Sequence, residues 1–350
     1  QILSGNIQDR FSPRLLLEDV YIRGNDVWSD GWDCGIDMVS VINASITRSY
    51  IVGKLNGSTS NYHSALGIKT SGLGNPCVLT IDQPFIMCTT SAIISEDVEG
   101  LLILSPTIVS VQNGIIANNS NPLDLQPQVV VSNGHINQSG AGIILDSSWA
   151  ATITGNQISG ISDTPRDTSG IIIRGSSKAF NITNNTFENT SATFGMTGVA
   201  VEDGTAGFID NNVFANQEVA MWLTSGASKV RVGGGNINSE NPLGGNATWV
   251  VNQGTDSEIA TKTYTKSIVF TLSGGFATEF VQVPIPAKIF SAKPSYASLV
   301  DASGTQFLVT IYDHDDASNT ATNCRFILRR ADGVNITAGA HRLAFTASGY

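Results

Sequence analysis

The chain has 350 residues, of which 14% are charged and 41% are apolar. This balance excludes a disordered chain, because disordered segments combine low hydrophobicity with high charge. The 19 basic and 29 acidic residues give a formal charge of −10, which argues against a nucleic-acid binder, because clustered cations bind phosphate backbones. The 35 glycines, together with frequent Asn, Ser and Thr, are typical of many turns and short strands.

The sequence offers no signal for a membrane span, a cofactor or a metal. No apolar run approaches the ~20 residues that cross a bilayer. The chain begins at Gln1 without a signal segment, so we expect a fragment or a processed product. Phosphate-loop and zinc motifs are absent, and no close CxxC spacing occurs among Cys34, Cys77, Cys88 and Cys324. We therefore predict no cofactor and no metal site.

A repeat runs through the first 240 residues. Two apolar residues five positions apart recur, in most cases every 22–29 residues, with Asn, Gly, Ser or Pro between them. The pairs are Leu17/Ile22, Val41/Ile46, Ile81/Ile86, Ile103/Ile108, Val131/Ile136, Ile153/Ile158, Ile182/Phe187, Ile209/Phe214 and Val232/Ile237. A step of 40 residues between the second and third pairs indicates an insertion. A fixed period of this length is the signature of a solenoid.

A second sequence element, which begins with glycine, recurs with the same period as these pairs. It reads G-I-D-M at 35–38, G-I-K-T at 67–70, G-I-I-A at 114–117, G-I-I-L at 142–145, G-I-I-I at 170–173 and G-V-A-V at 198–201. Asn133, Asn156, Asn184–Asn185 and Asn211–Asn212 suit a sharp corner, because Asn tolerates a left-handed backbone. The apolar residues alternate by two, which excludes a helical solenoid. We predict three short strands per coil, stacked into a right-handed, single-stranded parallel β-helix of about nine coils.

This repeat resembles the pectate-lyase-like right-handed parallel β-helix superfamily, which includes polygalacturonases and bacteriophage tailspikes. The resemblance covers roughly residues 10–250 and rests on the repeat rather than on a catalytic motif. The G-H-G and R-I-K triplets of polygalacturonases are absent, and Gly134-His135-Ile136 is the nearest match. The resemblance implies a sugar-binding groove along the glycine-led sheet.

The pattern changes after about residue 250. Alternating strands are expected at Ser267–Leu272, Glu279–Val283, Phe307–Tyr312 and Arg325–Leu328, and they predict an antiparallel β-sandwich. We therefore expect an all-β protein with a β-helix depolymerase domain at 1–255 and a C-terminal β-sandwich at 263–350. The sandwich resembles the trimerising end of tailspikes. The resemblance thus implies a homotrimer in a virion tail or outside the cell, without nucleic-acid or membrane partners.

Alternation in the glycine-led strands places two columns of side chains on the outer surface. The first column is Asp37, Lys69, Ile94, Ile116, Ile144, Ile172, Ala200 and Trp222. The second column is Val39, Ser71, Glu96, Asn118, Asp146, Arg174, Glu202 and Thr224. The isoleucines would form an exposed apolar stripe, which usually marks a covered surface. We consider three groups that would cover this isoleucine stripe: a loop of the same chain, a second subunit and a bound sugar.

The second column carries the predicted chemistry. Neighbouring coils lie ~4.8 Å apart, so the backbones of Asp146 and Glu202, two coils apart, should be ~9.6 Å apart. Flexible side chains would bring the carboxyl groups within the ~6.5–9.5 Å of an inverting glycosidase. We predict that these two residues hydrolyse a bacterial surface polysaccharide (O-antigen, capsule or exopolysaccharide), with Arg174 steadying substrate or charge. Alternatively, Arg174 only neutralises a structural charge ladder.

Further residues are expected to contact the sugar. Insertions at 159–169 and 188–197 would wall the groove, and aromatic faces stack on sugar rings. The predicted substrate-binding residues are Glu96, Asp163, Arg166, Asp167, Trp149 and Trp222. Two alternatives stay open. One is a polysaccharide lyase or epimerase that depends on Arg174 or Lys69, and the other is a receptor-binding or adhesin spike without turnover.

Overall fold

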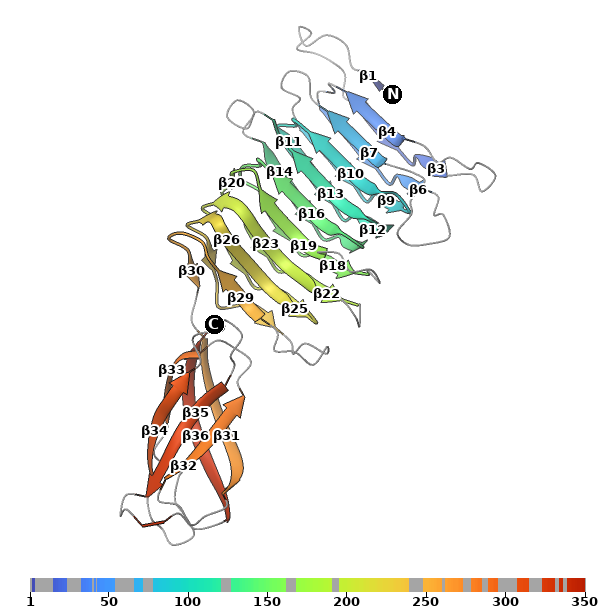
Figure 1. Cartoon of the computed structure of the whole chain (residues 1–350). Coiled ribbons are helices and arrows are strands. Elements are labelled where there is room, and N and C mark those ends of the chain that lie inside the picture. Colours follow the sequence, from blue (N-terminus) through green and yellow to red (C-terminus); the bar gives the residue numbers. More distant parts are fainter. Residues whose placement is uncertain are drawn as a thin grey trace. The chain divides into compact units, whose positions relative to one another are not determined.

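The computed structural model describes strands throughout the chain, and none of the described residues is helical (Figure 1). Accordingly, no helix among them is long and apolar enough to cross a membrane. The described residues are 2–3, 15–23, 33–39, 41, 43–53, 66–71, 78–120, 127–161, 168–190, 195–238, 248–259, 262–272, 278–284, 289–294, 307–314, 323–330, 334–335 and 339–349.

Three parallel sheets build the first part of the chain, and each coil contributes one strand to each sheet (Figure 1). Sheet A contains β1 (Ile2–Leu3), β4 (Cys34–Val39), β7 (Leu66–Ser71), β10 (Ser91–Glu96), β13 (Asn113–Asn118), β16 (Ala141–Asp146), β19 (Thr168–Arg174), β23 (Met196–Thr205), β26 (Val219–Ser228) and β29 (Thr248–Asn252), with β20 (Ser177–Lys178) beside β23. Sheet B contains β2 (Leu15–Glu18), β5 (Ala44–Thr47), β8 (Leu79–Asp82), β11 (Gly100–Leu104), β14 (Gln128–Ser132), β17 (Thr152–Thr154), β21 (Asn181–Thr183), β24 (Phe208–Asp210), β27 (Arg231–Val232) and β30 (Glu258–Ile259). Sheet C contains β3 (Tyr21–Arg23), β6 (Tyr50–Val52), β9 (Phe85–Met87), β12 (Thr107–Val111), β15 (His135–Gln138), β18 (Gln157–Gly160), β22 (Thr186–Asn189), β25 (Val213–Ala215) and β28 (Ile237–Asn238). This is the predicted parallel β-helix.

The core is the inside of the coils, where the repeated apolar residues stack. Ile81, Ile103 and Ile153 are fully buried in sheet B, and Phe187 stacks on Phe214 in sheet C with ring centroids 4.8 Å apart. A single coil could not bury the apolar side chains of these short strands, because they are shielded from water only by the coils stacked above and below. Stacking therefore produces one continuous core.

Two of the predicted apolar pairs are wrong. Leu17 pairs with Ile46, which in turn pairs with Ile81, so the second coil uses the pair Ile46/Ile51. Val41 lies before strand β5. The sequence does not distinguish Val41/Ile46 from Ile46/Ile51, because the residues of each pair are five positions apart. In the last coil, Ile237 pairs with outward Val213 and is 59% exposed. One extra residue in the preceding glycine-rich corner moves Ile237 to the outer surface.

The asparagine corners join sheet B to sheet C. Asn133, Asn184 and Asn211 have φ values of 55°, 57° and 55°, which confirms the left-handed backbone expected of them. The same expectation is wrong for Asn156, Asn185 and Asn212, each of which follows the left-handed residue of its corner. A ladder of buried amides follows, in which each side chain donates from Nδ2 to Oδ1 of the next at 3.0 Å. The ladder consists of Asn156, Asn185, Asn212 and Asn236. It was not predicted from the sequence, because the corner asparagines look alike there.

The chain divides into two compact units: residues 1–245 with 250–258, and residues 246–249 with 259–350. In the second unit, two three-stranded antiparallel sheets form the predicted sandwich. One sheet contains β31 (Lys262–Leu272), β36 (Gly339–Gly349) and β33 (Ile289–Pro294), and the other contains β32 (Thr278–Pro284), β35 (Asn323–Arg330) and β34 (Phe307–His314). Sequence analysis missed β33 and β36. Trimerisation through this unit stays a prediction.

Candidate active site on sheet A

The register of sheet A aligns the second outward column as the sequence predicts. Successive partners are Val39, Ser71, Glu96, Asn118, Asp146 and Arg174. On the next strand, Ile173 pairs with Val201, so Glu202 directly follows the last aligned pair. The register then shifts between Val201 and Asp203 where β23 meets β26. Ionisable residues of three successive coils therefore occupy one edge of the sheet.

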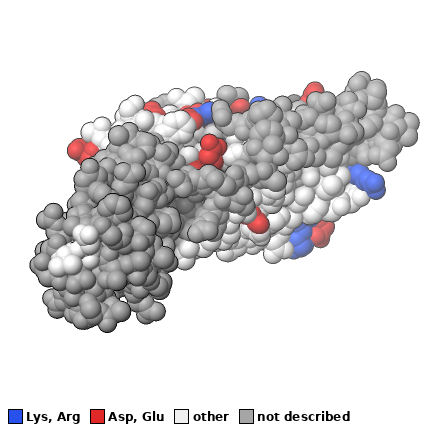
Figure 2. All heavy atoms as spheres, turned by 60° about the horizontal axis from the view of Figure 1, so that its bottom comes forward, with Lys and Arg blue, Asp and Glu red and all other residues white. Residues whose placement is uncertain are grey.

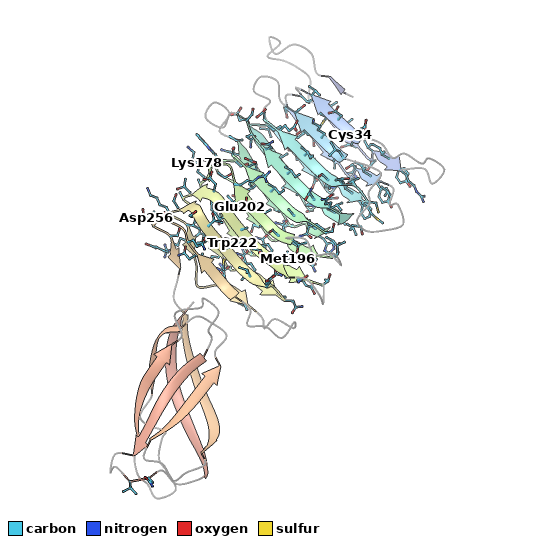
Figure 3. The ribbon with its side chains drawn as sticks, in the orientation of Figure 1. Cys34, Lys178, Met196, Glu202, Trp222 and Asp256 are labelled. Carbon is cyan, nitrogen blue, oxygen red and sulfur yellow. The ribbon has the colours of Figure 1, made fainter. Side chains whose placement is uncertain are left out.

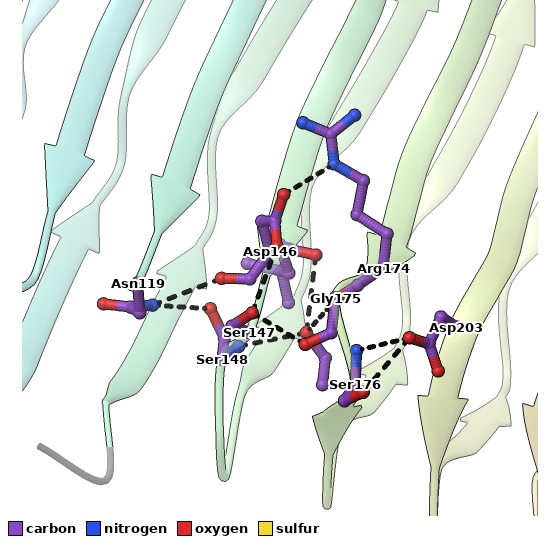
Figure 4. A network of polar contacts seen from close by, with 10 residues as sticks. Asn119, Asp146, Ser147, Ser148, Arg174, Gly175, Ser176 and Asp203 are labelled. Atoms are coloured by element: carbon purple, nitrogen blue, oxygen red, sulfur yellow. Dashed lines mark hydrogen bonds and ion pairs between the residues drawn. The ribbon is translucent and has the colours of Figure 1, made fainter. Parts of the chain in front are cut away.

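Arg174 turns toward Asp146. Its Nε donates to Oδ2 of Asp146 at 2.9 Å, and the two side chains are 44% and 24% exposed (Figure 4). The hydroxyl of Ser147 lies 3.2 Å from Oδ1 of Asp146 and donates to the carbonyl of Gly175 at 2.7 Å. Among the described residues, Nε is the guanidinium nitrogen that has a hydrogen-bond partner.

Gly175 makes room for this arrangement. Its φ of +65° is left-handed, and a Cβ at this position would overlap Oδ1 of Asp146 and approach the nitrogen of Ser147 to 2.9 Å. A glycine therefore lets the chain turn sharply behind Arg174 without displacing the carboxylate. Sequence analysis did not single out this residue, although a glycine directly after a charged outward residue was a usable signal.

Glu202 and Trp222 lie on the neighbouring strands β23 and β26 (Figure 3). Glu202 is exposed, and its backbone oxygen accepts a hydrogen bond from Oγ1 of Thr224 at 2.5 Å. Among the described ion pairs, Arg174 contacts Asp146 and not Glu202. Glu202 thus lies one coil from a cation that pairs with the carboxylate on its other side.

The first outward column also has the predicted register, from Asp37 to Trp222. The expected exposed isoleucine stripe is wrong, however. Ile144 is only 8% exposed and the other three isoleucines are half-buried, because isoleucines of successive coils pack against one another. Trp222 at the end of the column is 43% exposed and flanks buried Ala200. Trp222 is therefore the exposed aromatic side chain of this column.

The coil repeat and this register point to one fold family. The family described as "Right handed beta helix region" matches residues 85–260. The chain belongs to this family. No curated protein matches the sequence.

Several solved structures are similar to this right-handed β-helix chain. The tailspike protein gp49 of Pseudomonas phage LKA1 is 10% identical, with a TM-score of 0.32, and the match covers 97% of this chain and 68% of that one. The Gp54 tailspike of Acinetobacter baumannii bacteriophage AP22, solved with a capsular saccharide, is 9% identical, with a TM-score of 0.42 and coverages of 97% and 65%. The enzymatically active domain of tailspike protein 2 of bacteriophage CBA120 is 12% identical, with a TM-score of 0.47 and coverages of 95% and 65%. The chain spans about two thirds of the length of these proteins.

The other predicted substrate-binding residues have different surroundings. Glu96 pairs with Lys69 at 3.1 Å, five coils from Trp222 on the same face of the β-helix. Trp149 lies in the turn between sheets A and B, where Lys178 Nζ is 2.9 Å from its ring centroid and covers one face. Asp163, Arg166 and Asp167 lie outside the described residues.

Two carboxylates that sequence analysis missed bond to turns that follow strands of sheet A: Asp97 lies in the turn after β10, and Asp203 lies within β23. Asp97 accepts hydrogen bonds from the backbone nitrogen and the hydroxyl of Ser120, and Asp203 accepts the same pair from Ser176 (Figure 4). These bonds satisfy turn backbones of the β-helix, so both carboxylates have a structural role.

No group of three His, Cys, Asp or Glu side chains in the described part of the chain could hold a metal ion. On the face shown in Figure 2, acidic and basic side chains are scattered and form no basic patch among the residues drawn in colour or white.

Proposed function

We propose that this right-handed β-helix chain is a tailspike-like protein that binds and hydrolyses a bacterial surface polysaccharide. The observation that carries the proposal is the row of Asp146, Arg174 and Glu202 on three successive coils of an exposed sheet, beside the exposed ring of Trp222. From Glu96 to Trp222 the sheet extends across five coil spacings, or about 24 Å. A surface of that length contacts several sugar rings of one polysaccharide chain.

The mechanism is a two-carboxylate hydrolysis. Arg174 holds the Asp146 carboxylate in place through an ion pair at 2.9 Å, and this carboxylate is the base that takes a proton from water. The water oxygen then attacks the anomeric carbon, and Glu202 gives its proton to the departing glycosidic oxygen. Two coil spacings of ~4.8 Å between the backbones are compatible with the ~6.5–9.5 Å carboxyl separation of inverting enzymes.

Arg174 and Trp222 hold the substrate in this scheme. The terminal nitrogens of Arg174 donate to sugar hydroxyls or acidic substituents, and the face of Trp222 stacks on a sugar ring. Trp149 is a weaker platform because Lys178 occupies one face of its ring. We further propose that the protein acts in a virion tail or outside the cell as a homotrimer.

Two substitutions test the assignment. Asp146→Asn and Glu202→Gln should each abolish shortening of the polysaccharide, followed by size-exclusion chromatography and reducing-end release across a panel of O-antigens, capsules and exopolysaccharides. The matched control is Asp82→Asn, which removes a half-buried outward carboxylate of sheet B and should leave cleavage intact. Unchanged cleavage in both sheet A variants would overturn the assignment.

The same assay separates the alternatives. A lyase or epimerase would need Arg174 or Lys69 beside a uronate, and Lys69 already pairs with Glu96 in the described sheet. Products that absorb in the ultraviolet through a new double bond would identify a lyase. Binding without any loss of chain length would identify a receptor-binding or adhesin spike.

A further inference from the structure

The coil that contains Glu202 is one residue shorter than both of its neighbours at the end of sheet A. Two matched positions frame this part of the three coils, and they bound residues 201–204 in β23, 173–177 in the coil before it and 223–227 in β26. The chain therefore takes three steps in β23 and four in each neighbour. In β26 the extra residue produces the register shift and forms a bulge opposite Glu202.

The bulge of β26 bonds to the main chain of Glu202. Thr224 and Ser225 both lie opposite this residue. Oγ1 of Thr224 donates to the Glu202 carbonyl at 2.5 Å and accepts a hydrogen bond from the nitrogen of Gly226 at 3.2 Å. A Cβ on Gly226 would overlap the same carbonyl oxygen, so the bulge fits closely against it. The Thr224 hydroxyl thus joins the two strands where their backbones are out of register.

On the other side, the next residue of β23 bonds to the neighbouring coil. Asp203 directly follows Glu202, and its carboxylate accepts hydrogen bonds from the backbone nitrogen and the hydroxyl of Ser176 at 2.9 and 3.1 Å (Figure 4). Ser176 lies two residues after Arg174. The backbone of Glu202 is therefore fixed between the coil of Arg174 and the coil of Trp222.

The direction of the Glu202 side chain follows from this backbone. Among the described ion pairs, none includes the Glu202 carboxylate, which is exposed. Bulges beside active sites redirect a side chain by bending the backbone that carries it or the strand next to it. We propose that Thr224 is a positioning residue: through the carbonyl of Glu202 it sets the direction in which the carboxyl of that residue points. This role rests on the hydrolysis proposed above, in which Glu202 is the general acid.

Two substitutions of Thr224 separate the effect of its hydroxyl from that of its size. Thr224→Val keeps the size and removes the hydroxyl that bonds to the Glu202 carbonyl. On the polysaccharide of the panel that wild type shortens, its kcat should fall roughly tenfold to a hundredfold, because a small displacement of a reacting group has an effect of this size. Thr224→Ser keeps the hydroxyl and should rescue kcat. KM should stay unchanged in both variants, because Trp222 precedes the register shift and stays paired with Ala200.

Two further variants complete the design. Thr183→Val is the matched control, because Thr183 is a half-buried threonine of sheet B whose hydroxyl also bonds to a neighbouring coil, and cleavage should be unchanged. Gly226→Ala displaces the Glu202 carbonyl while leaving Thr224 in place, so it should lower kcat as Thr224→Val does. Circular dichroism spectra should match wild type for all four variants.

The outcomes separate the positioning role from the proposed hydrolysis. A folded Thr224→Val chain with wild-type kcat, beside an inactive Glu202→Gln chain, would overturn the positioning role and leave the hydrolysis intact. A raised KM with unchanged kcat would do the same, and so would equal losses in Thr224→Val and Thr224→Ser, because neither result depends on the hydroxyl bond to the carbonyl. A wild-type chain that shortens no polysaccharide of the panel, or a Glu202→Gln chain that still cleaves, would overturn the hydrolysis and with it this role.

Discussion

The asparagine ladder offers a quantitative test of what holds the coils together. Asn185 is 1% exposed; its Oδ1 accepts from the backbone nitrogen and from Nδ2 of Asn156, and its Nδ2 donates to Ile153 O and to Asn212 Oδ1, all at 3.0 Å. Asn185→Ala therefore removes a partner from two buried backbone groups, the N–H of Asn156 and the C=O of Ile153. At about 1–3 kcal/mol for each buried group left unsatisfied, the free energy of unfolding should fall by about 2–6 kcal/mol.

Urea unfolding followed by circular dichroism measures this loss. The control is Asn181→Ala, which truncates an exposed asparagine on the same coil and should change stability by less than about 0.5 kcal/mol. Asn185→Asp should lose at least as much as Asn185→Ala, because it places a carboxylate oxygen against the oxygens of Ile153 and Asn212 in a buried site. A loss for Asn185→Ala no larger than that of the control would refute the view that the ladder stabilises the coils.

Three further predictions concern charge, thiols and the glycine behind the site. A hydrogen bond from Arg48 lowers the pKa of Asp19 below its ordinary value of 3.8, so the stabilisation is present above that value and is lost as pH falls through the folded pKa; Asp19→Asn should flatten the stability profile below about pH 4. Burial raises the pKa of the Cys34 and Cys88 thiols, so peptide mapping should find both alkylated slowly in the folded chain and rapidly in urea. Gly175→Ala should cost about 1–2 kcal/mol for its left-handed backbone, and it should reduce polysaccharide cleavage because the new methyl group displaces the neighbouring carboxylate.

The register of sheet A was predictable because the glycine column fixes it. A Cβ at Gly142 would lie 2.5 Å from the carbonyl oxygen of Gly170 on the next coil and 2.7 Å from buried Ile158. Glycine therefore occupies this position in most coils, and the small residues Ala92 and Ala220 take its place in two others. Counting from that residue gave the outward columns, including Asp146 and Arg174.

Other features depend on geometry that a linear pattern does not contain. The sequence places Arg174 equally between two carboxylates, and the side-chain rotamer alone decides that it pairs with Asp146. Burial of the isoleucine column was missed because alternation tells inside from outside but not how tightly outward side chains pack against each other. The Val41 error shows that a spacing of five residues is too short to separate a strand from the turn before it.

A crystal structure of the Glu202→Gln variant with a bound oligosaccharide would show whether sheet A holds the substrate. We expect sugar rings along the outer face of sheet A, one of them stacked on Trp222, with a glycosidic oxygen within hydrogen-bonding distance of residue 202 and a water beside Asp146. An oligosaccharide bound on sheet B, on sheet C or to the C-terminal unit, with these side chains untouched, would contradict it.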